Sequence, residues 1–229
     1  MERAGPECLP KEPFDIDEVF RRLRLVCRDL PKAAMFELRD RGYASPFELL
    51  VAAVISTRTR DETTVRVAAA LFAQARTPQE VLDLPETALR EALASATFAD
   101  AKARSIPALS AILVERYGGQ VPADAAELRE FPGVGPKVAN LVSGVAFGKP
   151  AIAVDIHVHR VANRWGYVCA PTPEKTEQQL REALPERYWV EINERLVPFG
   201  KFVCTGPRPK CSNCLLLAQC RQVGVTTHA

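Results

Sequence analysis

Apolar residues recur at steps of three and four residues along most of this chain, and that spacing most constrains its fold. In the stretch 16–30, Ile16, Val19, Phe20 and Leu23 fall on one side and arginines on the other. One face of an α-helix repeats with this period, whereas a β-strand alternates at every second residue. The sequence contains no alternating run of useful length. It therefore predicts an all-α protein.

Side chains that cap helices precede several of these apolar repeats. The candidates are Asp15, Ser45, Asp61, Asp124 and Asp155. Their oxygens can accept hydrogen bonds from the unpaired amides of a first helical turn. Pro46 and Pro136 stand at first helical positions, where a missing amide is tolerated. We expect further helices over 99–117, 174–184 and 188–203.

Composition limits the class of protein. The 229 residues are 47% hydrophobic and 25% charged, which is ordinary for a globular chain and leaves room for one large domain or two small ones. No apolar run approaches the length that spans a bilayer, and the polar start does not resemble a secretory signal. We therefore expect a protein that works inside the cell and binds no membrane.

The net charge of +2 does not by itself indicate a nucleic-acid binder. Its distribution is more informative, because no acidic residue follows Glu194. The basic residues beyond it are Arg195, Lys201, Arg208, Lys210 and Arg221. This basic end is the part of the chain best suited to contact phosphate, although five charges also fit an ordinary solvated surface.

Four of the seven cysteines lie within 17 residues near the C-terminus. They are Cys204, Cys211, Cys214 and Cys220, spaced C-x6-C-x2-C-x5-C. Thiolates this close together in a reducing compartment indicate a shared metal, either tetrahedral zinc or an iron–sulfur cluster. Zinc ribbons normally pair two C-x-x-C motifs, and only one occurs here, which favours iron–sulfur. Arg208 and Lys210 lie between the first two ligands, so the same loop could face phosphate.

Residues 133–137 read Gly-Val-Gly-Pro-Lys between two predicted helices. Two glycines one residue apart permit a sharp turn and the close approach of another molecule. The amides of such a turn, with those at the start of the next helix, point outward and suit a phosphate oxygen. Gly133, Val134 and Gly135 are therefore candidate contacts with a DNA backbone, although an ordinary helix–helix turn also explains the motif.

Lys137 and Asp155 are the candidate catalytic pair. Lys137 lies in the first turn of a helix, where the positive end of the helix dipole favours the free amine that a Schiff-base nucleophile needs. Asp155 follows 18 residues later and is also an N-cap, which suits catalysis because a capping carboxylate is held rigidly. Taken singly, a surface lysine and a plain N-cap explain both residues. His157 and His159 lie two residues apart, on different faces of a helix, which excludes them as a metal-binding pair.

Three stretches together resemble the endonuclease III family of bifunctional DNA glycosylases, in the helix-hairpin-helix superfamily. They are FPGVGPKVAN at 131–140, AVDIHVHRV at 153–161 and the cysteine spacing. The resemblance covers roughly residues 15–222.

The fold that this resemblance implies has two α-helical domains with a DNA cleft between them. A six-helix barrel domain is expected at 39–149, with its helix-hairpin-helix at about 125–147. Residues 1–38 and 150–229 are expected to form the second domain, around a 4Fe–4S cluster.

The resemblance also implies roles for single residues. Lys137 matches the family's nucleophile, Asp155 its catalytic carboxylate, and the four cysteines its cluster ligands. The implied function is base-excision repair, in which oxidised or damaged pyrimidines leave duplex DNA through a lysine Schiff base and β-elimination nicks the strand. Contacts with DNA are expected from Gly133, Val134, Gly135, His157, Arg208 and Lys210. We expect a monomer that binds duplex DNA with damaged bases or abasic sites, at the nucleoid in a bacterial cytoplasm, or in a nucleus or organelle.

Two positions depart from the family pattern. Where the family usually has S-x-Q-[ST]-x-D, this chain has Ser-Thr-Arg-Thr-Arg-Asp at 56–61, with Arg58 in place of glutamine. The family's leucine region, on the other side of the pocket, reads Ala-Thr-Phe at 96–98. A flipped base leaves a hole in the stack that side chains must fill. Arg58 and Phe98 are the candidates for that role, and they leave the lesion preference open.

Three other functions fit parts of the pattern. Adenine- and thymine-mismatch glycosylases belong to the same superfamily but usually lack the lysine. A weakly active or non-catalytic helix-hairpin-helix protein could keep the hairpin and the cluster as a DNA-binding scaffold. A zinc-stabilised interaction protein could use the same four cysteines. The presence of both Lys137 and Asp155 favours the bifunctional glycosylase.

Overall fold

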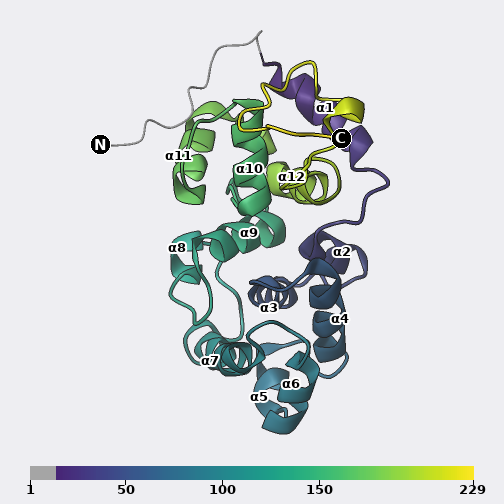
Figure 1. Ribbon diagram of the computed structural model, residues 1–229. Coiled ribbons are helices and arrows are strands. Elements are labelled where there is room, and N and C mark those ends of the chain that lie inside the picture. The colour runs from purple at the N-terminus through teal and green to yellow at the C-terminus, as the bar shows by residue number, and fades with distance from the viewer. Residues whose placement is uncertain (1–13) are drawn as a thin grey trace, which may run out of the picture. The chain divides into compact units, whose positions relative to one another are not determined.

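The structure, a computed structural model, describes residues 14–229, and every regular element in that range is a helix (Figure 1). The all-α prediction is therefore confirmed. The helices are α1 (Ile16–Val26), α2 (Ala34–Asp40), α3 (Pro46–Ser56), α4 (Asp61–Phe72), α5 (Pro78–Asp83), α6 (Glu86–Leu93), α7 (Ala99–Tyr117), α8 (Ala125–Leu128), α9 (Pro136–Phe147), α10 (Ile156–Trp165), α11 (Pro173–Ala183) and α12 (Glu191–Phe202), with short 3₁₀ turns η1 (Glu186–Tyr188) and η2 (Cys211–Asn213). None of the described helices is long and apolar enough to cross a membrane.

Four of the five predicted capping side chains cap the helix that follows them. The Ser45 hydroxyl accepts from the Glu48 amide at 3.2 Å, and the Glu48 carboxylate accepts from the Ser45 amide at 3.0 Å, which completes a capping box. Asp15, Asp124 and Asp155 also cap the helices that follow them, as predicted. These starts are local, because each cap and its amides lie within three residues of one another.

Asp61 is the exception among the predicted caps. It is the first residue of α4, and its carboxylate accepts from the amide of Ala34 at 3.1 Å. The N-cap residue of α2, Ala33, has no side chain that can accept a hydrogen bond, so Asp61 caps the start of α2 from a distant part of the chain, and four of the seven residues of α2 are buried. A tertiary partner has therefore replaced the local cap at Asp61, and the predicted role was wrong.

Internal contacts divide the chain into two compact units. The continuous unit is Ala33–Ala151, and the discontinuous unit joins the described residues up to Lys32 with Ile152–Ala229. The first division falls before α2, whereas the sequence places its boundary at residues 38 and 39, inside that helix. α2 belongs with the continuous unit because it packs on α3 and α4.

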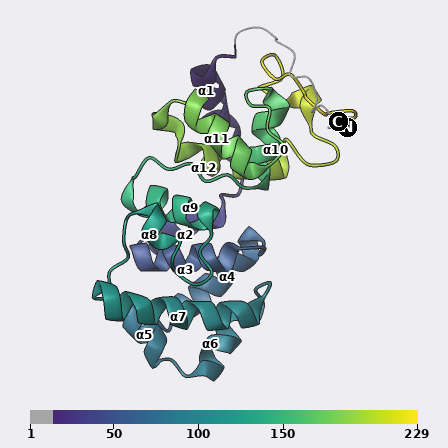
Figure 2. The same ribbon diagram turned by 90° about the vertical axis from the view of Figure 1, so that its left-hand side faces the viewer.

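In the continuous unit α3 is the central helix. Its residues from Phe47 to Ile55 are all buried, and it packs on α2, α4, α7 and α9. The long helix α7 lies between α3 and the pair formed by α5 and α6 (Figure 2). α8 packs on α9, so both helices of the hairpin are tied to α3. The loop that leaves α3 and the loop that enters α7 therefore project from one packed core.

The discontinuous unit has its own core, built mainly from α1, α10 and α12. Phe20, Trp165 and Phe199 are at most 2% exposed in this core, and Cys27 is buried beside them. α10 packs on both α11 and α12, and α1 packs on α12. Phe20 stacks on Tyr188 with the ring centroids 3.9 Å apart. The first and last parts of the chain thus share one hydrophobic interior.

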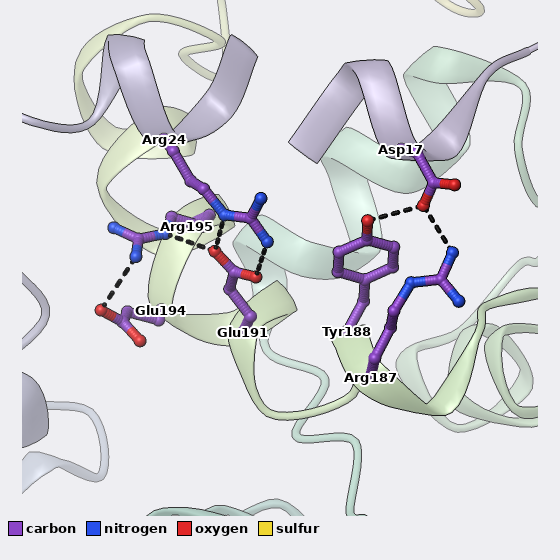
Figure 3. A network of polar contacts seen from close by, with 7 residues as sticks. All are labelled: Asp17, Arg24, Arg187, Tyr188, Glu191, Glu194 and Arg195. Carbon is purple, nitrogen blue, oxygen red and sulfur yellow. Dashed lines mark hydrogen bonds and ion pairs between the residues drawn. The ribbon is translucent and has the colours of Figure 1, made fainter. Parts of the chain in front are cut away.

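Polar contacts fasten α1 to the segment from η1 to α12 (Figure 3). Arg24 donates twice to the Glu191 carboxylate, at 2.8 and 2.7 Å, and Arg195 donates to it at 3.0 Å. Burial alone would raise the pKa of Glu191, but the hydrogen bonds from Arg24 and Arg195 outweigh burial and keep the pKa below its ordinary value. Asp17 accepts from the Tyr188 hydroxyl at 2.6 Å. These contacts hold together residues that are 167 and 171 positions apart.

Candidate functional site

The glycine turn joins α8 to α9, and its two glycines differ. Gly133 has a φ of +81°, and a side chain there would lie 3.2 Å from the Ser105 Cβ and 3.5 Å from Val54. This position therefore needs glycine for both its backbone conformation and its packing. Gly135 has a φ of −92° and open space where a side chain would stand. Its lack of a side chain leaves room for another molecule to approach the backbone.

Val134 serves the packing of the turn rather than its surface. Its side chain is 7% exposed, and its amide donates to the Phe131 carbonyl at 3.1 Å. α9 begins at Pro136, and its N-cap, Gly135, has no side chain to accept from the first-turn amides. Such an uncapped helix start suits an anion. A phosphate contact from this turn would therefore come from Gly135 and the first turn of α9. Val134, which was expected to contact DNA, instead stabilises the turn through its buried side chain and its amide hydrogen bond.

Lys137 is the second residue of α9 and is half-buried. α9 packs on α3, and the neighbours of Gly133 are Val54, near the end of α3, and Ser105, in the first half of α7. The glycine turn and Lys137 therefore belong to the same neighbourhood of the continuous unit as the loops that leave α3 and enter α7.

Asp155 is held in place by its own helix and by the segment before it. Its Oδ1 accepts from the amides of His157 and Val158, both at 2.9 Å, and so caps α10. Residues 151–154 are buried, and the Asn193 side chain donates to a carbonyl of this segment at 3.1 Å. Both capping bonds end on Oδ1, and together they hold the carboxylate in one orientation at the start of α10.

His157 and His159 have different partners, which agrees with their exclusion as a metal-binding pair. The His157 Nδ1 lies 3.1 Å from the Arg160 Nη2, and a side chain at Gly200 would come within 2.9 Å of the His157 Cβ. The His159 Nδ1 lies 2.7 Å from the Thr176 hydroxyl, and burial lowers the pKa of His159. His157 thus packs closely on the backbone of α12 and remains half-exposed.

The four C-terminal cysteines line one cavity, together with apolar side chains from α10 and α12. Hydrogen-bond donors reach two of the sulfurs. The Arg164 guanidinium lies 3.5 Å from the Cys204 Sγ, and the Gln222 amide lies 3.4 Å from the Cys220 Sγ. Donors of this kind stabilise thiolates that bind a metal group. Burial raises the pKa of Cys220 to about 11, so a bound cation is needed to keep this thiol deprotonated at neutral pH.

Two observations bear on whether these residues can hold a metal group. Across residues 14–229, no group of three or more His, Cys, Asp or Glu side chains is arranged to hold a single metal ion. The four thiols share one cavity with apolar side chains, and donors reach two of the sulfurs, which is a setting that fits an iron–sulfur cluster with four cysteine ligands.

The loop between the first two of these cysteines exposes Arg208 and Lys210. Arg164 fixes the backbone of this loop by donating to two of its carbonyls, at 2.5 and 2.6 Å. The two basic side chains therefore extend from an anchored backbone, which suits contact with phosphate.

Arg58 and Phe98 occupy unusual backbone conformations. Residues 57–60, between α3 and α4, form the Arg58 loop, and residues 94–98, between α6 and α7, form the Phe98 loop. Both residues have a φ of +58°, in the left-handed region, which costs a non-glycine residue about 1 kcal/mol or more. Both side chains are exposed, Phe98 by 65%. An exposed arginine and an exposed phenylalanine are thus presented from strained positions.

Lys102, in the first half of α7, joins these two loops and is only 4% exposed. Its Nζ donates to the carbonyls of Ile55 (2.6 Å), Thr57 (3.0 Å) and Thr97 (2.7 Å) and to the Thr59 hydroxyl (2.7 Å). No motif in the sequence marks this residue. The one signal for it is that Lys102 lies four residues before the fully buried Ile106, on the inward face of α7.

Burial lowers the pKa of Lys102 to about 8. A lowered pKa is typical of nucleophilic lysines. The geometry excludes that role, because Nζ is enclosed by four oxygen acceptors and a sugar cannot reach it. Lys137 therefore remains the candidate nucleophile.

The stability contribution of Lys102 is expected to depend on pH. Its pKa is 10.5 as a free side chain and about 8 in the folded protein, with burial as the sole cause of the shift. Between these values the unfolded chain binds more protons than the folded one. The free energy of unfolding therefore rises with pH there, by at most about 1.4 kcal/mol per pH unit. Urea unfolding of the wild type and of Lys102→Met across this range measures the effect, and a constant difference between the two proteins would contradict the lowered pKa.

Comparisons with known proteins agree on one family. Residues 51–186 match the model of the HhH-GPD superfamily of base excision DNA repair proteins. Endonuclease III of Thermotoga maritima is 44% identical over 182 residues, which cover 80% of this chain and 85% of that protein. Endonuclease III of Escherichia coli K12 is 34% identical over 179 residues, which cover 78% and 85%.

Solved structures agree with these relatives. A non-covalent complex of endonuclease III with DNA has a TM-score of 0.78 at 34% identity, and the match covers 90% of this chain and 94% of that one. A trapped covalent intermediate of endonuclease III with DNA has a TM-score of 0.74 at the same identity, over 90% and 95%. A thermostable thymine-DNA glycosylase, at 19% identity and a TM-score of 0.70, shares the fold. The chain therefore belongs to the endonuclease III family, within the HhH-GPD superfamily of base excision DNA repair proteins.

Proposed function

We propose that this protein is a base-excision repair DNA glycosylase with abasic-site lyase activity, and that it removes oxidised or damaged pyrimidines from duplex DNA. One observation carries the proposal. Lys137 and Asp155 stand at the starts of two helices in a chain whose fold matches a trapped covalent intermediate of endonuclease III with DNA. A covalent adduct requires a nucleophile, and an amine can form the Schiff base that lyase chemistry uses.

Lys137 carries the covalent steps of this proposal. The damaged nucleotide leaves the base stack, because its glycosidic bond is out of reach in the duplex. The Nζ lone pair then forms a bond to C1′ of the sugar while the glycosidic bond breaks and its electron pair leaves with the base. The bound amine loses a proton and the C1′–O4′ bond of the sugar ring opens, with O4′ taking up a proton, so that an iminium forms at C1′. This iminium acidifies C2′, and loss of a proton there breaks the C3′–O bond and expels the 3′ phosphate. Water finally hydrolyses the Schiff base and releases the lysine.

Asp155 acts on the charge that develops during these steps. Its carboxylate takes a proton from the attacking amine and offsets the positive charge on the sugar. The capping bonds to the start of α10 hold it in one orientation, so no reorganisation is needed at the moment of reaction.

We also propose that the four cysteines hold a 4Fe–4S cluster, because they line a single cavity with donors directed at two of the sulfurs. When bound, the cluster organises the loop that carries Arg208 and Lys210 and takes no part in base removal. Those two residues, with Gly133, Gly135, His157 and the start of α9, then contact the DNA backbone. The continuous unit corresponds to the six-helix barrel domain and the discontinuous unit to the cluster domain. The protein acts as a monomer, on nucleoid DNA in a bacterial cytoplasm or in a nucleus or organelle.

The cluster is checked by the metal content of protein purified without oxygen. We expect about four iron and four sulfide per chain and a broad visible absorption band. Cys214→Ser removes one ligand and is expected to lose most of the iron and of the band, whereas replacement of the exposed Cys169 by serine keeps both. One zinc per chain in a colourless protein would contradict the cluster.

Incision of a panel of duplexes tests the proposed activity. The panel contains thymine glycol, an abasic site, an adenine mismatch, a thymine mismatch and undamaged DNA. We expect cleavage of the thymine glycol and abasic strands on the 3′ side of the lesion, with an unsaturated sugar at the 3′ end of the upstream fragment and a 5′ phosphate on the downstream fragment. Removal of a mismatched base alone would support a mismatch glycosylase. Binding of DNA without any cleavage would support a non-catalytic DNA-binding protein and would contradict the proposed enzyme.

Arg58→Gln is expected to change the lesion preference without changing cleavage of abasic sites. Arg58 is exposed and is presented from a fixed loop, so its length and charge meet the gap or the orphaned partner base when a nucleotide flips. Glutamine is shorter and neutral, and the single-turnover rate on individual lesions is expected to change by about 10-fold in either direction. The measurement is base release from several lesions by the wild type and the variant. Identical rates and preference in both proteins would argue against a gap-filling role.

A further inference from the structure

Lys102 stands out among the buried polar groups, because its ammonium is enclosed by backbone and hydroxyl oxygens and meets no carboxylate of residues 14–229. The four acceptors come from the end of α3, the Arg58 loop and the Phe98 loop. All four are uncharged, so no ion pair offsets the burial of the charge. An apolar side chain at this position of α7 could be buried at a lower free-energy cost. A buried charge in such a place is therefore expected to serve a purpose other than stability.

The contacts of Lys102 fall immediately beside the two strained residues. Thr57 and Thr59, which it holds, flank Arg58, and Thr97, which it also holds, precedes Phe98. A left-handed conformation at a non-glycine residue persists only where the surroundings impose it. Lys102 supplies hydrogen bonds to both loops at these points.

A second bond ties the two loops directly. The Thr59 hydroxyl accepts from the Thr97 amide at 3.2 Å, besides accepting from the Lys102 Nζ. Thr59 is therefore shared between the lysine and both loops. Nζ has three N–H donors for four acceptors, of which the Thr59 hydroxyl is one. Because that hydroxyl also accepts from Thr97, the lysine and the two loops form one connected hydrogen-bond network.

We propose that Lys102 is a positioning residue that holds the Arg58 loop and the Phe98 loop at a fixed separation, and so sets where Arg58 and Phe98 enter the DNA. This inference rests on the proposed function, because it takes those two side chains as the parts that meet the opened base stack. Lys102 itself touches no substrate. It acts through the carbonyls and the hydroxyl that it holds, and a shift of about 1 Å at such a distance from the chemistry can cost about 100-fold in rate.

Two variants and one matched control test the proposal. Lys102→Met keeps an unbranched side chain that is one atom shorter and removes all the donors of Nζ. Thr59→Val keeps the shape of the side chain and removes the shared acceptor. The control is Thr57→Val, in the same loop, because the Thr57 hydroxyl meets only the Ala53 carbonyl, at 3.5 Å, and Lys102 uses the Thr57 backbone instead.

The activity test compares two substrates. Release of a damaged base requires the base to be flipped and the gap to be filled, whereas borohydride trapping on a preformed abasic site requires only the Lys137 chemistry. We expect Lys102→Met to lower base release by about 100-fold and Thr59→Val by about 10-fold. Trapping on abasic DNA is expected to fall less than about threefold in both, and Thr57→Val to match the wild type in both assays. A fluorescent base analogue placed opposite the lesion is expected to report less base unstacking with Lys102→Met and Thr59→Val than with the wild type.

Equal losses on the two substrates would overturn the proposal, because they would indicate a general loss of folded enzyme. The combined Lys102→Met and Thr59→Val variant gives a further check. If the two residues act through one network, it releases base no more slowly than Lys102→Met alone, whereas multiplied losses would indicate independent effects.

Hydrogen–deuterium exchange separates failure of this inference from failure of the proposed function. Exchange of residues 57–60 and 94–98 is expected to accelerate in Lys102→Met and Thr59→Val and to stay at the wild-type rate in Thr57→Val. This readout needs no activity and no DNA. If the wild type cleaves no DNA but the exchange pattern is as expected, the proposed function is refuted and the role of Lys102 in holding the two loops stands. If the wild type is active but the amides of both loops exchange at the same rate in the wild type and in all three variants, only the role of Lys102 in holding the loops is refuted.

Discussion

Lys137→Ala protein is expected to form no borohydride-stable adduct with abasic-site DNA. The Nζ of Lys137 is the proposed source of the Schiff base, so its removal deletes the covalent step rather than weakening it. We expect trapping and strand cleavage to fall at least about 1,000-fold, with the affinity for the same duplex within a few-fold of the wild type. The measurement is a gel assay of the trapped complex under single-turnover conditions, alongside a binding titration without borohydride.

Two other lysines of the continuous unit serve as controls in this experiment. Lys149 is exposed and follows the end of the same helix, so Lys149→Ala is expected to trap like the wild type. Lys102 has a lowered pKa but is enclosed by four acceptors, so Lys102→Met is expected to retain trapping. If Lys137→Ala traps as well as the wild type, the lyase assignment is wrong. If only Lys102→Met loses trapping, the nucleophile is the buried lysine.

Asp155→Asn is expected to separate folding from catalysis. Asparagine caps a helix about as well as aspartate, so the free energy of unfolding is expected to change by less than about 0.5 kcal/mol. The substitution removes the negative charge that the proposal uses to accept a proton and to stabilise the charged sugar. Base release is therefore expected to fall by about 100- to 10,000-fold. Urea unfolding and single-turnover base release measure the two effects independently.

Asp15 offers a matched control for this substitution. Its Oδ1 accepts from the amides of Asp17 and Glu18 at 3.0 and 3.1 Å, so it caps α1 in the same geometry as Asp155 caps α10. Asp15→Asn is expected to be neutral for both stability and activity. Comparable activity in Asp155→Asn and Asp15→Asn would reduce Asp155 to a structural cap and would remove the carboxylate from the mechanism.

The sequence predicted the elements whose causes are local. α7 begins and ends where the sequence places it, at 99 and 117, because an apolar stripe runs along that stretch and two glycines, Gly118 and Gly119, follow it directly. The caps at Asp15, Ser45, Asp124 and Asp155 were recognisable because each acts on amides two or three residues further along.

The candidate site was predictable to the same extent. The four cysteines share a cavity because they lie within 17 residues of one another. The roles of Lys137 and Asp155 were predicted from the resemblance to the family, because their positions at helix starts taken singly also fit a surface lysine and a plain N-cap. Val134 was a candidate because the amides of the turn were expected to point outward, yet its amide donates to the Phe131 carbonyl within the turn.

What the sequence by itself determined was therefore the helical class and the capped helix starts at Asp15, Ser45, Asp124 and Asp155. The metal-ligand set and the catalytic pair stay predictions from the sequence. What only the tertiary structure decided was the existence of α2, the partner of Asp61 and the role of Lys102. Asp61 meets an amide 27 residues away, and Lys102 meets a carbonyl 47 residues away. Such contacts depend on how distant segments pack, because packing alone brings their donors and acceptors within hydrogen-bonding distance.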